Sequence, residues 1–199
     1  MGPLEALQTL ARKVSIDVSF IGETLDPVSP KPAVMTPISQ NAWQDVVPTH
    51  TYDNPPSDLE VLMVPGGAWS RNPDLNTTFD FLKDTYPELK YFFTACTGSY
   101  VAARSGLLDG KRATTNKAAY TSLTPLVPAV DWVPHARWVV DGNIWTTSGV
   151  SAGIDGTLAL IECLYGTAMT EWISDQMEYE RHTYPRWDPF AAVFNVTDA

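Results

Sequence analysis

The sequence is poor in basic residues, cysteine and histidine, and it has no long apolar run. It carries 13 Lys and Arg against 23 Asp and Glu, which gives a formal net charge of -10. A chain this acidic repels polyanions, so we exclude nucleic acid and anionic membrane surfaces as partners. We also exclude a membrane-spanning protein, because no apolar stretch is long enough to cross a bilayer.

Two cysteines, Cys96 and Cys163, are too few for a disulfide framework. No basic segment followed by an apolar one opens the chain, so we expect a cytoplasmic protein with both thiols reduced. Cys163 lies on the apolar face of a predicted helix and is expected in the core. The histidines, His50, His135 and His182, fall in no ligand spacing, so we predict no metal site and no cofactor.

The sequence does contain enough apolar residues for a globular core. Its hydrophobic content of 44% and charged content of 18% exclude a disordered chain. A chain of 199 residues can bury a sizeable core but is short for two ordinary domains. We therefore predict one domain over residues 1–199, in which residues 170–199 form a C-terminal helix and an aromatic tail.

Strand-like and helix-like segments alternate along the chain. We expect strands at 14–21, 61–64, 91–95 and 112–115 and a hairpin at 137–140 and 144–147. We expect helices at 4–12, 79–86, 102–108, 120–127 and 154–165 and from 171 onward. A Pro-rich connection spans 22–51, with a short strand or hairpin near 34–36. This alternation predicts an α/β fold with three layers, in which helices cover both faces of a mostly parallel sheet.

The segment 91–100 carries the strongest chemical signal. A β-prone aromatic run ends on Cys96, and Thr97, Gly98 and Ser99 precede a helix. A strand, a tight turn carrying a thiol and a helix are typical of a nucleophile elbow, whose turn requires small neighbours. The helix N-terminus points its N–H groups at the sulfur, which favours thiolate. The alternative is a buried structural cysteine.

A second loop, 64–67, follows the strand 61–64 directly. Because the carboxyl ends of parallel strands share one edge of the sheet, we expect this loop to meet Cys96. Trp69 is then expected to overhang the pocket. Asp155 is a candidate for pairing near the site, or it serves only as a carboxylate at a helix start.

Four motifs occur in order and resemble the ThiJ/PfpI superfamily, which has the class I glutamine amidotransferase-like fold. They are Val-Pro-Gly-Gly at 64–67, Ala-Cys-Thr-Gly-Ser at 95–99, the segment 106–115 and Ser-Gly-Val-Ser-Ala-Gly-Ile-Asp at 148–155. The resemblance covers about residues 2–165. The Cys-Thr-Gly elbow looks like the isocyanide (isonitrile) hydratase branch, and the tail, with Glu178-Tyr179 and Asp188-Pro189-Phe190-Ala191, looks like its fungal members.

The resemblance implies a flavodoxin-like sheet, a homodimer, a small-molecule substrate and Cys96 as nucleophile. It implies an anion-binding nook lined by the N–H groups of Gly67 and Thr97. In a hydratase the thiolate attacks the terminal carbon of R–N≡C, and water then releases an N-formamide. The candidate pocket residues are Gly66, Trp69, Asn116, Asp155 and Glu5.

The family places an acidic residue after its first strand, a few residues before the Gly-Pro that opens the first helix. Here Gly2 and Pro3 are the second and third residues, so we expect the first strand and its carboxylate to be absent. We hypothesise that the chain begins at an internal methionine of a longer protein. Glu5 is one turn into the helix and is a candidate substitute. A missing central strand would leave apolar surface and backbone groups for a partner chain or a local rearrangement to cover.

Two alternatives to a hydratase stay open. One is a non-catalytic dimer, or one that senses oxidation of Cys96. The other is a thiol enzyme acting on glyoxals or amides, such as a glyoxalase, deglycase or amidase, but those branches usually place His where this chain has Thr97. Asn116 and Lys117 also stand where bacterial relatives usually carry His-Trp, which predicts a different pocket.

Overall fold

The chain folds around a four-stranded sheet built from its short apolar runs. The computed structural model describes residues 2–31 and 43–196. The sheet contains β3 (Val61–Val64), β4 (Tyr91–Ala95), β7 (Trp138–Asp141) and β8 (Ile144–Thr147), in the order β3-β4-β8-β7. The first three strands in this order run parallel, and β7 joins β8 as the antiparallel arm of the predicted hairpin. The sheet is therefore mostly parallel, as predicted.

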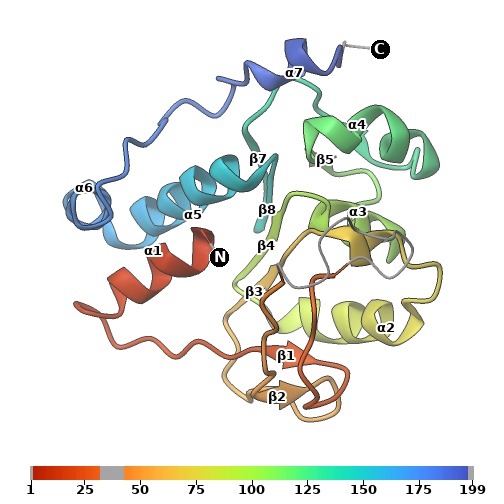
Figure 1. Cartoon of the computed structure of the whole chain (residues 1–199), viewed down its shortest axis with the longest axis horizontal. Helices are drawn as coiled ribbons and strands as arrows, with labels where there is room; N and C mark the ends of the chain where they lie inside the picture. Colours follow the sequence, from red (N-terminus) through yellow and green to blue (C-terminus); the bar gives the residue numbers. More distant parts are fainter. Residues whose placement is uncertain (1, 32–42, 197–199) are drawn as a thin grey trace.

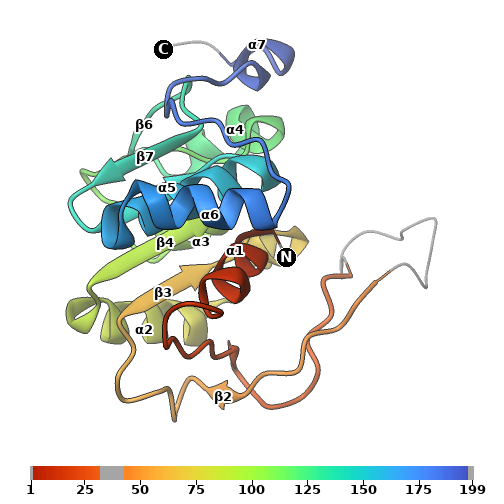
Figure 2. The same cartoon turned by 90° about the vertical axis from the view of Figure 1, so that its left-hand side faces the viewer.

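Helices cover both faces of this sheet, which confirms the three-layer α/β prediction (Figures 1 and 2). One layer contains α1 (Gly2–Leu10), α5 (Val150–Tyr165) and α6 (Thr167–Gln176), which pack against one another. The other contains α2 (Asn76–Thr85) and α3 (Gly98–Arg104). Within residues 2–31 and 43–196, no helix is both long and apolar enough to cross a membrane.

Side chains of each central strand alternate between the two helical layers. Leu62 and Phe92 join the core that α2 and α3 cover. Phe93 and Trp145 point to the other face and pack with Leu160 of α5. Both faces of β3, β4 and β8 are thus apolar, which is why these strands read as continuous hydrophobic runs.

Shorter elements complete the described chain. Two further strand pairs are parallel: β1 (Ile21–Gly22) with β2 (His50–Thr51), and β5 (Arg112–Ala113) with β6 (Asp131–Trp132). The remaining helices are α4 (Lys117–Leu123), α7 (Phe190–Val193) and the 3-10 turns η1 (Ala68–Arg71), η2 (Tyr86–Glu88) and η3 (Thr124–Leu126).

The predicted strand at 14–21 is wrong except for Ile21, which joins β1. The segment 15–20 has no strand partner, and Val18 and Phe20 remain 40% and 36% exposed. Val14 and Ile16 do pack against α1 and α5, so only the first half of the alternation reflects burial. The Phe20 carbonyl oxygen accepts from the N–H groups of Thr49 and His50, but this contact at the end of the segment does not extend into a ladder. Among the described residues no strand pairs with the outer edge of β3.

Several predicted helix boundaries are shifted. α3 and α5 begin at Gly98 and Val150, about four residues earlier than expected, because the small residues of the preceding turns already adopt helical geometry. The helix predicted at 120–127 is α4 followed by η3, since Pro125 ends the α-helical hydrogen bonding. Cys163 is exposed, contrary to the prediction, because the last turn of α5 faces solvent. The hairpin expected near 34–36 lies outside the described residues.

We predict that Gly98→Ala destabilises the fold by about 1–3 kcal/mol, as overpacking of a fixed site does. A Cβ at Gly98 would lie 2.2 Å from the Val64 carbonyl oxygen, and that oxygen belongs to backbone that cannot swing aside. Gly153→Ala is the matched control, because a Cβ at this helical glycine meets its neighbours at an ordinary 3.4 Å or more. Urea unfolding midpoints measure both, and equal midpoints would contradict the prediction.

Candidate active site

The elbow predicted at Cys96 is present. Cys96 has a φ of 58°, a backbone conformation that residues with a Cβ rarely adopt. Its N–H donates to the Thr147 carbonyl oxygen at 3.1 Å, so β8 holds the turn from one side. Its carbonyl oxygen accepts hydrogen bonds from the hydroxyls of Ser99 at 3.0 Å and Thr115 at 3.2 Å. These bonds maintain the strained turn that presents the thiol.

The loop after β3 crosses the elbow at very short range. A Cβ at Gly66 would lie 2.5 Å from the Thr97 nitrogen and 2.7 Å from the Cys96 Cβ. Gly67 adopts a φ of 141°, which favours glycine. The two glycines are therefore required for this crossing, which brings the loop to Cys96 as predicted.

A small cavity of about 210 Å³ opens beside the thiol. It is lined by Gly67, Arg71, Cys96, Thr97, Asn116, Ala118 and Ala119. Four of the predicted site residues, Cys96, Thr97, Gly67 and Asn116, thus meet in one place. Gly66 supports them from the crossing described above. The described residues of this lining include no carboxylate.

Burial raises the pKa of the Cys96 thiol above its ordinary value of 9.0. Hydrogen bonds from the N–H and hydroxyl of Thr97 and from the Asn116 side chain oppose this rise, as does the positive charge of Arg71. The net direction differs from the thiolate predicted from the helix N-terminus. Desolvation of the sulfur outweighs the donors, so the resting group is a thiol near neutral pH.

The Thr97 hydroxyl stands at the centre of a local hydrogen-bond network. The Gly67 N–H donates to it at 3.0 Å, and the Ser70 hydroxyl donates to it at 3.0 Å. The Gly67 N–H is therefore already engaged in this structure, whereas it was predicted to face an anion. The Ser70 hydroxyl also lies 2.8 Å from the Gly67 carbonyl oxygen and has one proton for the two acceptors. The Thr97 proton in turn has both the Cys96 sulfur and, at 3.3 Å, the same Gly67 carbonyl oxygen as acceptors.

Three other predicted site residues do not join this cavity. Asp155 is fully buried, where it accepts from Arg137 Nε at 2.6 Å and from the His182 backbone N–H at 3.0 Å. It therefore attaches the C-terminal tail to the body of the protein. Glu5 is exposed on α1, and Trp69 packs into the core covered by α2 and α3.

The sequence did not single out Arg71, Ser70 or Thr115 for the site. Arg71 could have been found from its position four residues after Gly67. The hydroxyls of Ser70 and Thr115 reach the elbow from two other chain segments, at Thr97 and at the Cys96 carbonyl oxygen. A local sequence pattern does not reveal such contacts.

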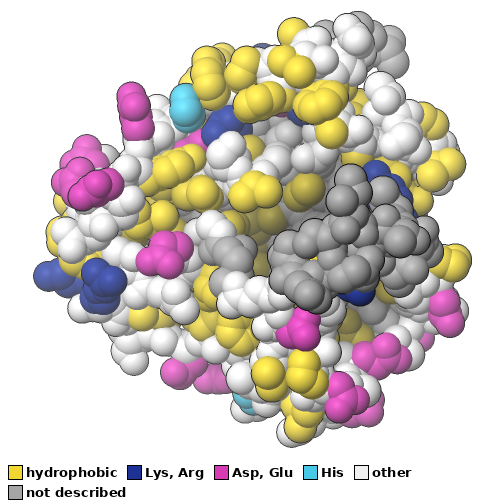
Figure 3. Space-filling view, in the orientation of Figure 1, with side chains coloured by type: hydrophobic (Ala, Val, Ile, Leu, Met, Phe, Trp, Pro, Cys, Tyr) yellow, Lys and Arg dark blue, Asp and Glu magenta, His cyan; other side chains and the backbone are white. Residues whose placement is uncertain are grey.

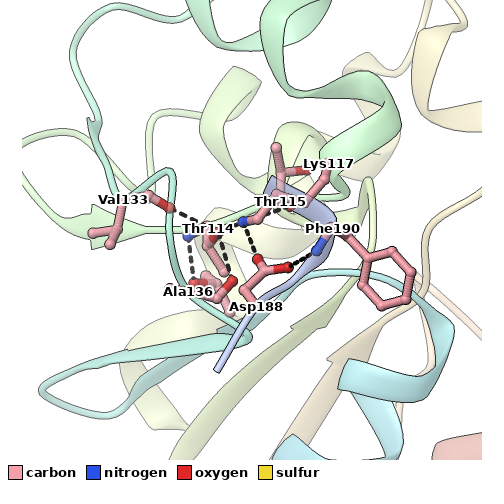
Figure 4. A network of polar contacts seen from close by, with 8 residues as sticks. Thr114, Thr115, Lys117, Val133, Ala136, Asp188 and Phe190 are labelled. Atoms are coloured by element: carbon pink, nitrogen blue, oxygen red, sulfur yellow. Dashed lines mark hydrogen bonds and ion pairs between the residues drawn. The ribbon is translucent and has the colours of Figure 1, made fainter. Parts of the chain in front are cut away.

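Lys117, the residue after Asn116, forms a buried ion pair with Asp188 (Figure 4). Lys117 Nζ lies 3.2 Å from the Asp188 carboxylate and donates to the Thr114 hydroxyl at 2.7 Å, and both charged side chains are at most 2% exposed. The other Asp188 oxygen accepts from the Phe190 N–H at 3.1 Å. Burial lowers the pKa of Lys117 to about 8, against the pull of Asp188. The C-terminal tail is thereby fastened to the residue next to Asn116.

We predict that Asn116→Ala raises the pKa of Cys96 further, because it removes a donor to the thiolate while burial persists. Since thiolate is the reactive form, alkylation by iodoacetamide should still be accelerating at pH 9 in the parent and should require higher pH in the variant. Cys163→Ser provides the background, and Asn76→Ala is the control at an exposed helix start. A pKa below 9 in the parent would contradict this account.

The comparisons with known proteins agree with the motifs. A model of the DJ-1/PfpI family matches residues 1–163. An isonitrile hydratase from Pseudomonas putida is 37% identical over 147 residues, which are 73% of this chain and 62% of that protein. The transcriptional regulator GbdR from Pseudomonas aeruginosa is 28% identical over 68% of this chain and 36% of its own length. This chain thus spans less than two thirds of either relative.

Solved structures show the same fold. A ThiJ/PfpI family protein from Pseudomonas syringae superposes with a TM-score of 0.73 at 29% identity, over 91% of this chain and 69% of that one. An AraC family transcriptional regulator from Pseudomonas putida has a TM-score of 0.69 at 19% identity, over 88% and 90% of the two chains. The family match covers most of the sequence and contains the elbow with Gly98 and the crossing loop with Gly66 and Gly67. The chain therefore belongs to the DJ-1/PfpI family.

Proposed function

We propose that this chain acts as an isonitrile hydratase-like cysteine enzyme, adding water to R–N≡C to give an N-formamide. The observation that carries the proposal is the Cys96 thiol on its elbow, with Thr97 and Asn116 beside it in the lining of one cavity. The similarity to the Pseudomonas putida isonitrile hydratase supports the same chemistry. A cavity of about 210 Å³ suits a slender group such as an isonitrile at the sulfur.

The reaction divides into two additions at one carbon. The sulfur of Cys96 first bonds to the terminal isonitrile carbon, and the thiol proton ends on that carbon, which gives the thioimidate R–N=CH–S–Cys. Water then adds to the same carbon, and a proton goes to nitrogen. The C–S bond breaks, the sulfur regains a proton, and R–NH–CHO leaves. Covalent catalysis of this kind replaces one difficult addition by two easier ones.

Thr97 is the residue best placed to move the proton. Its oxygen accepts from the Gly67 N–H, and its hydroxyl hydrogen has the Cys96 sulfur and the Gly67 carbonyl oxygen as acceptors, so the hydroxyl can exchange a proton with the sulfur. A thiol with a raised pKa must lose its proton as the S–C bond forms, and a hydroxyl in contact with the sulfur can relay it. Glu5 and Asp155 are not in position to do so, because one is exposed on α1 and the other is bonded to Arg137.

Two features disfavour the alternatives. Oxidation sensors rely on an easily formed thiolate, whereas burial raises the pKa of Cys96. Glyoxal- and amide-directed relatives usually carry a histidine where this chain has Thr97. The homodimer and the small-molecule substrate inferred from the resemblance stay predictions.

We predict that the protein converts an aryl isocyanide to its formamide and that Cys96→Ala reduces turnover at least about a thousandfold, as loss of a nucleophile does. Cys163→Ala is the matched control, because this second thiol is exposed on α5 and should leave the rate unchanged. Formamide is quantified by chromatography. Equal turnover by the Cys96→Ala variant would refute the proposal.

A further inference from the structure

A second, larger cavity lies next to the thiol cavity. Its volume is about 380 Å³, and it is lined by the starts of α4 and α5 and by the tail around α7, with one side open to solvent. The two cavities share Asn116 and Ala118 as a common wall. The Asn116 amide nitrogen also lies 3.6 Å from the position that a Cβ at Gly149 would take, so Asn116 stands at the junction. We call this larger cavity the side chamber.

The lining of the side chamber is mainly apolar. Its apolar lining consists of Ala118, Val150, Ala152, Ile154, Phe190 and Phe194. Its charged residues, Lys117, Asp188 and Arg137, are each already engaged in a buried ion pair. In the space-filling view of Figure 3, hydrophobic side chains gather around α7 and continue into the hollow beneath it. A charged ligand group would find no free counter-charge in the described lining, whereas an apolar one would be desolvated there.

The tail holds one wall of the side chamber in place. Phe190 and Phe194 belong to a tail that the Lys117–Asp188 pair fastens to α4. Within the tail, the Phe190 N–H donates to the Asp188 carboxylate. Ala191 and Val196 are buried against Tyr120, which anchors the same turn from its other side. Phe190 and Phe194 are nevertheless 46% and 45% exposed, so they present apolar surface that the described residues do not fully cover.

We propose that the side chamber binds the apolar substituent of the substrate whose reacting carbon is at Cys96. This inference rests on the proposed function and specifies its substrate class as isonitriles with an uncharged aryl or branched alkyl group. A cavity of roughly 150 Å³ is enough to hold benzene, so about 380 Å³ accommodates a ring with further substituents. Because Asn116 and Ala118 line both cavities, a group in the side chamber adjoins the cavity that contains the sulfur.

The test measures selectivity at the sulfur without requiring turnover. In a Cys163→Ser background, Cys96 is modified by methyl and by benzyl methanethiosulfonate, and the ratio of the two rate constants is determined. Ala118→Leu adds bulk at an exposed position of the common wall, and Phe190→Ala with Phe194→Ala removes the aromatic wall. Each change should lower the benzyl-to-methyl ratio about fivefold or more, as loss of apolar contact of this size does.

Val193→Ala is the matched control, because Val193 is an exposed apolar residue of α7 outside the lining and should leave the ratio unchanged. An unchanged ratio in both the Ala118→Leu and the phenylalanine variants would overturn the side chamber. Turnover of methyl and benzyl isocyanide by the same proteins separates this result from the proposed function. Altered thiosulfonate selectivity without any turnover would leave the chamber supported and refute the hydratase, whereas turnover with unaltered selectivity would do the reverse.

Discussion

The close approach of two backbone segments controls this structure. The carbonyl of Val64 at the end of β3 fills the space that a side chain on Gly98 would need, and Gly66 lies against the Thr97 nitrogen. These contacts bring the loop after β3 and the elbow together at the carboxyl ends of neighbouring strands. They hold the backbone of Cys96 at a φ of 58°. The position of the sulfur is therefore set by glycines on separate segments and not by the cysteine's own preferences.

The same crowding determines the chemistry of the sulfur. It removes water from around Cys96, which raises the pKa of the thiol, and it places the Thr97 hydroxyl next to the sulfur, where the Gly67 N–H donates to the hydroxyl oxygen. Hydrogen-bond donors near the sulfur replace part of the solvation that the thiolate loses on burial. The resting group is therefore a protonated thiol, which loses its proton as the S–C bond forms. In this account proton movement depends on a hydroxyl, because no carboxylate lines the described cavity.

Much of the fold follows from local sequence. The runs 61–64 and 91–95 are apolar on both faces because both faces are covered, and the Cys-Thr-Gly turn requires small residues wherever it occurs. The segment 15–20 alternates like a strand, but Val18 and Phe20 are exposed and it forms no strand ladder. Alternation alone cannot show whether a neighbouring strand exists. The pairing of Lys117 with Asp188 was equally inaccessible, since it joins residues far apart in the chain and depends on how the tail returns to α4.

The most direct test of the account is the mass of the intact protein, quenched with acid during turnover of an isonitrile. The account predicts a transient adduct at Cys96 whose added mass equals that of the whole isonitrile, because thiol addition to the carbon loses no atoms. The adduct should be absent from Cys96→Ala and should decay as formamide accumulates. Formamide production by the native chain with no adduct at any quench time, or with an adduct only at Cys163, would contradict nucleophilic catalysis by Cys96.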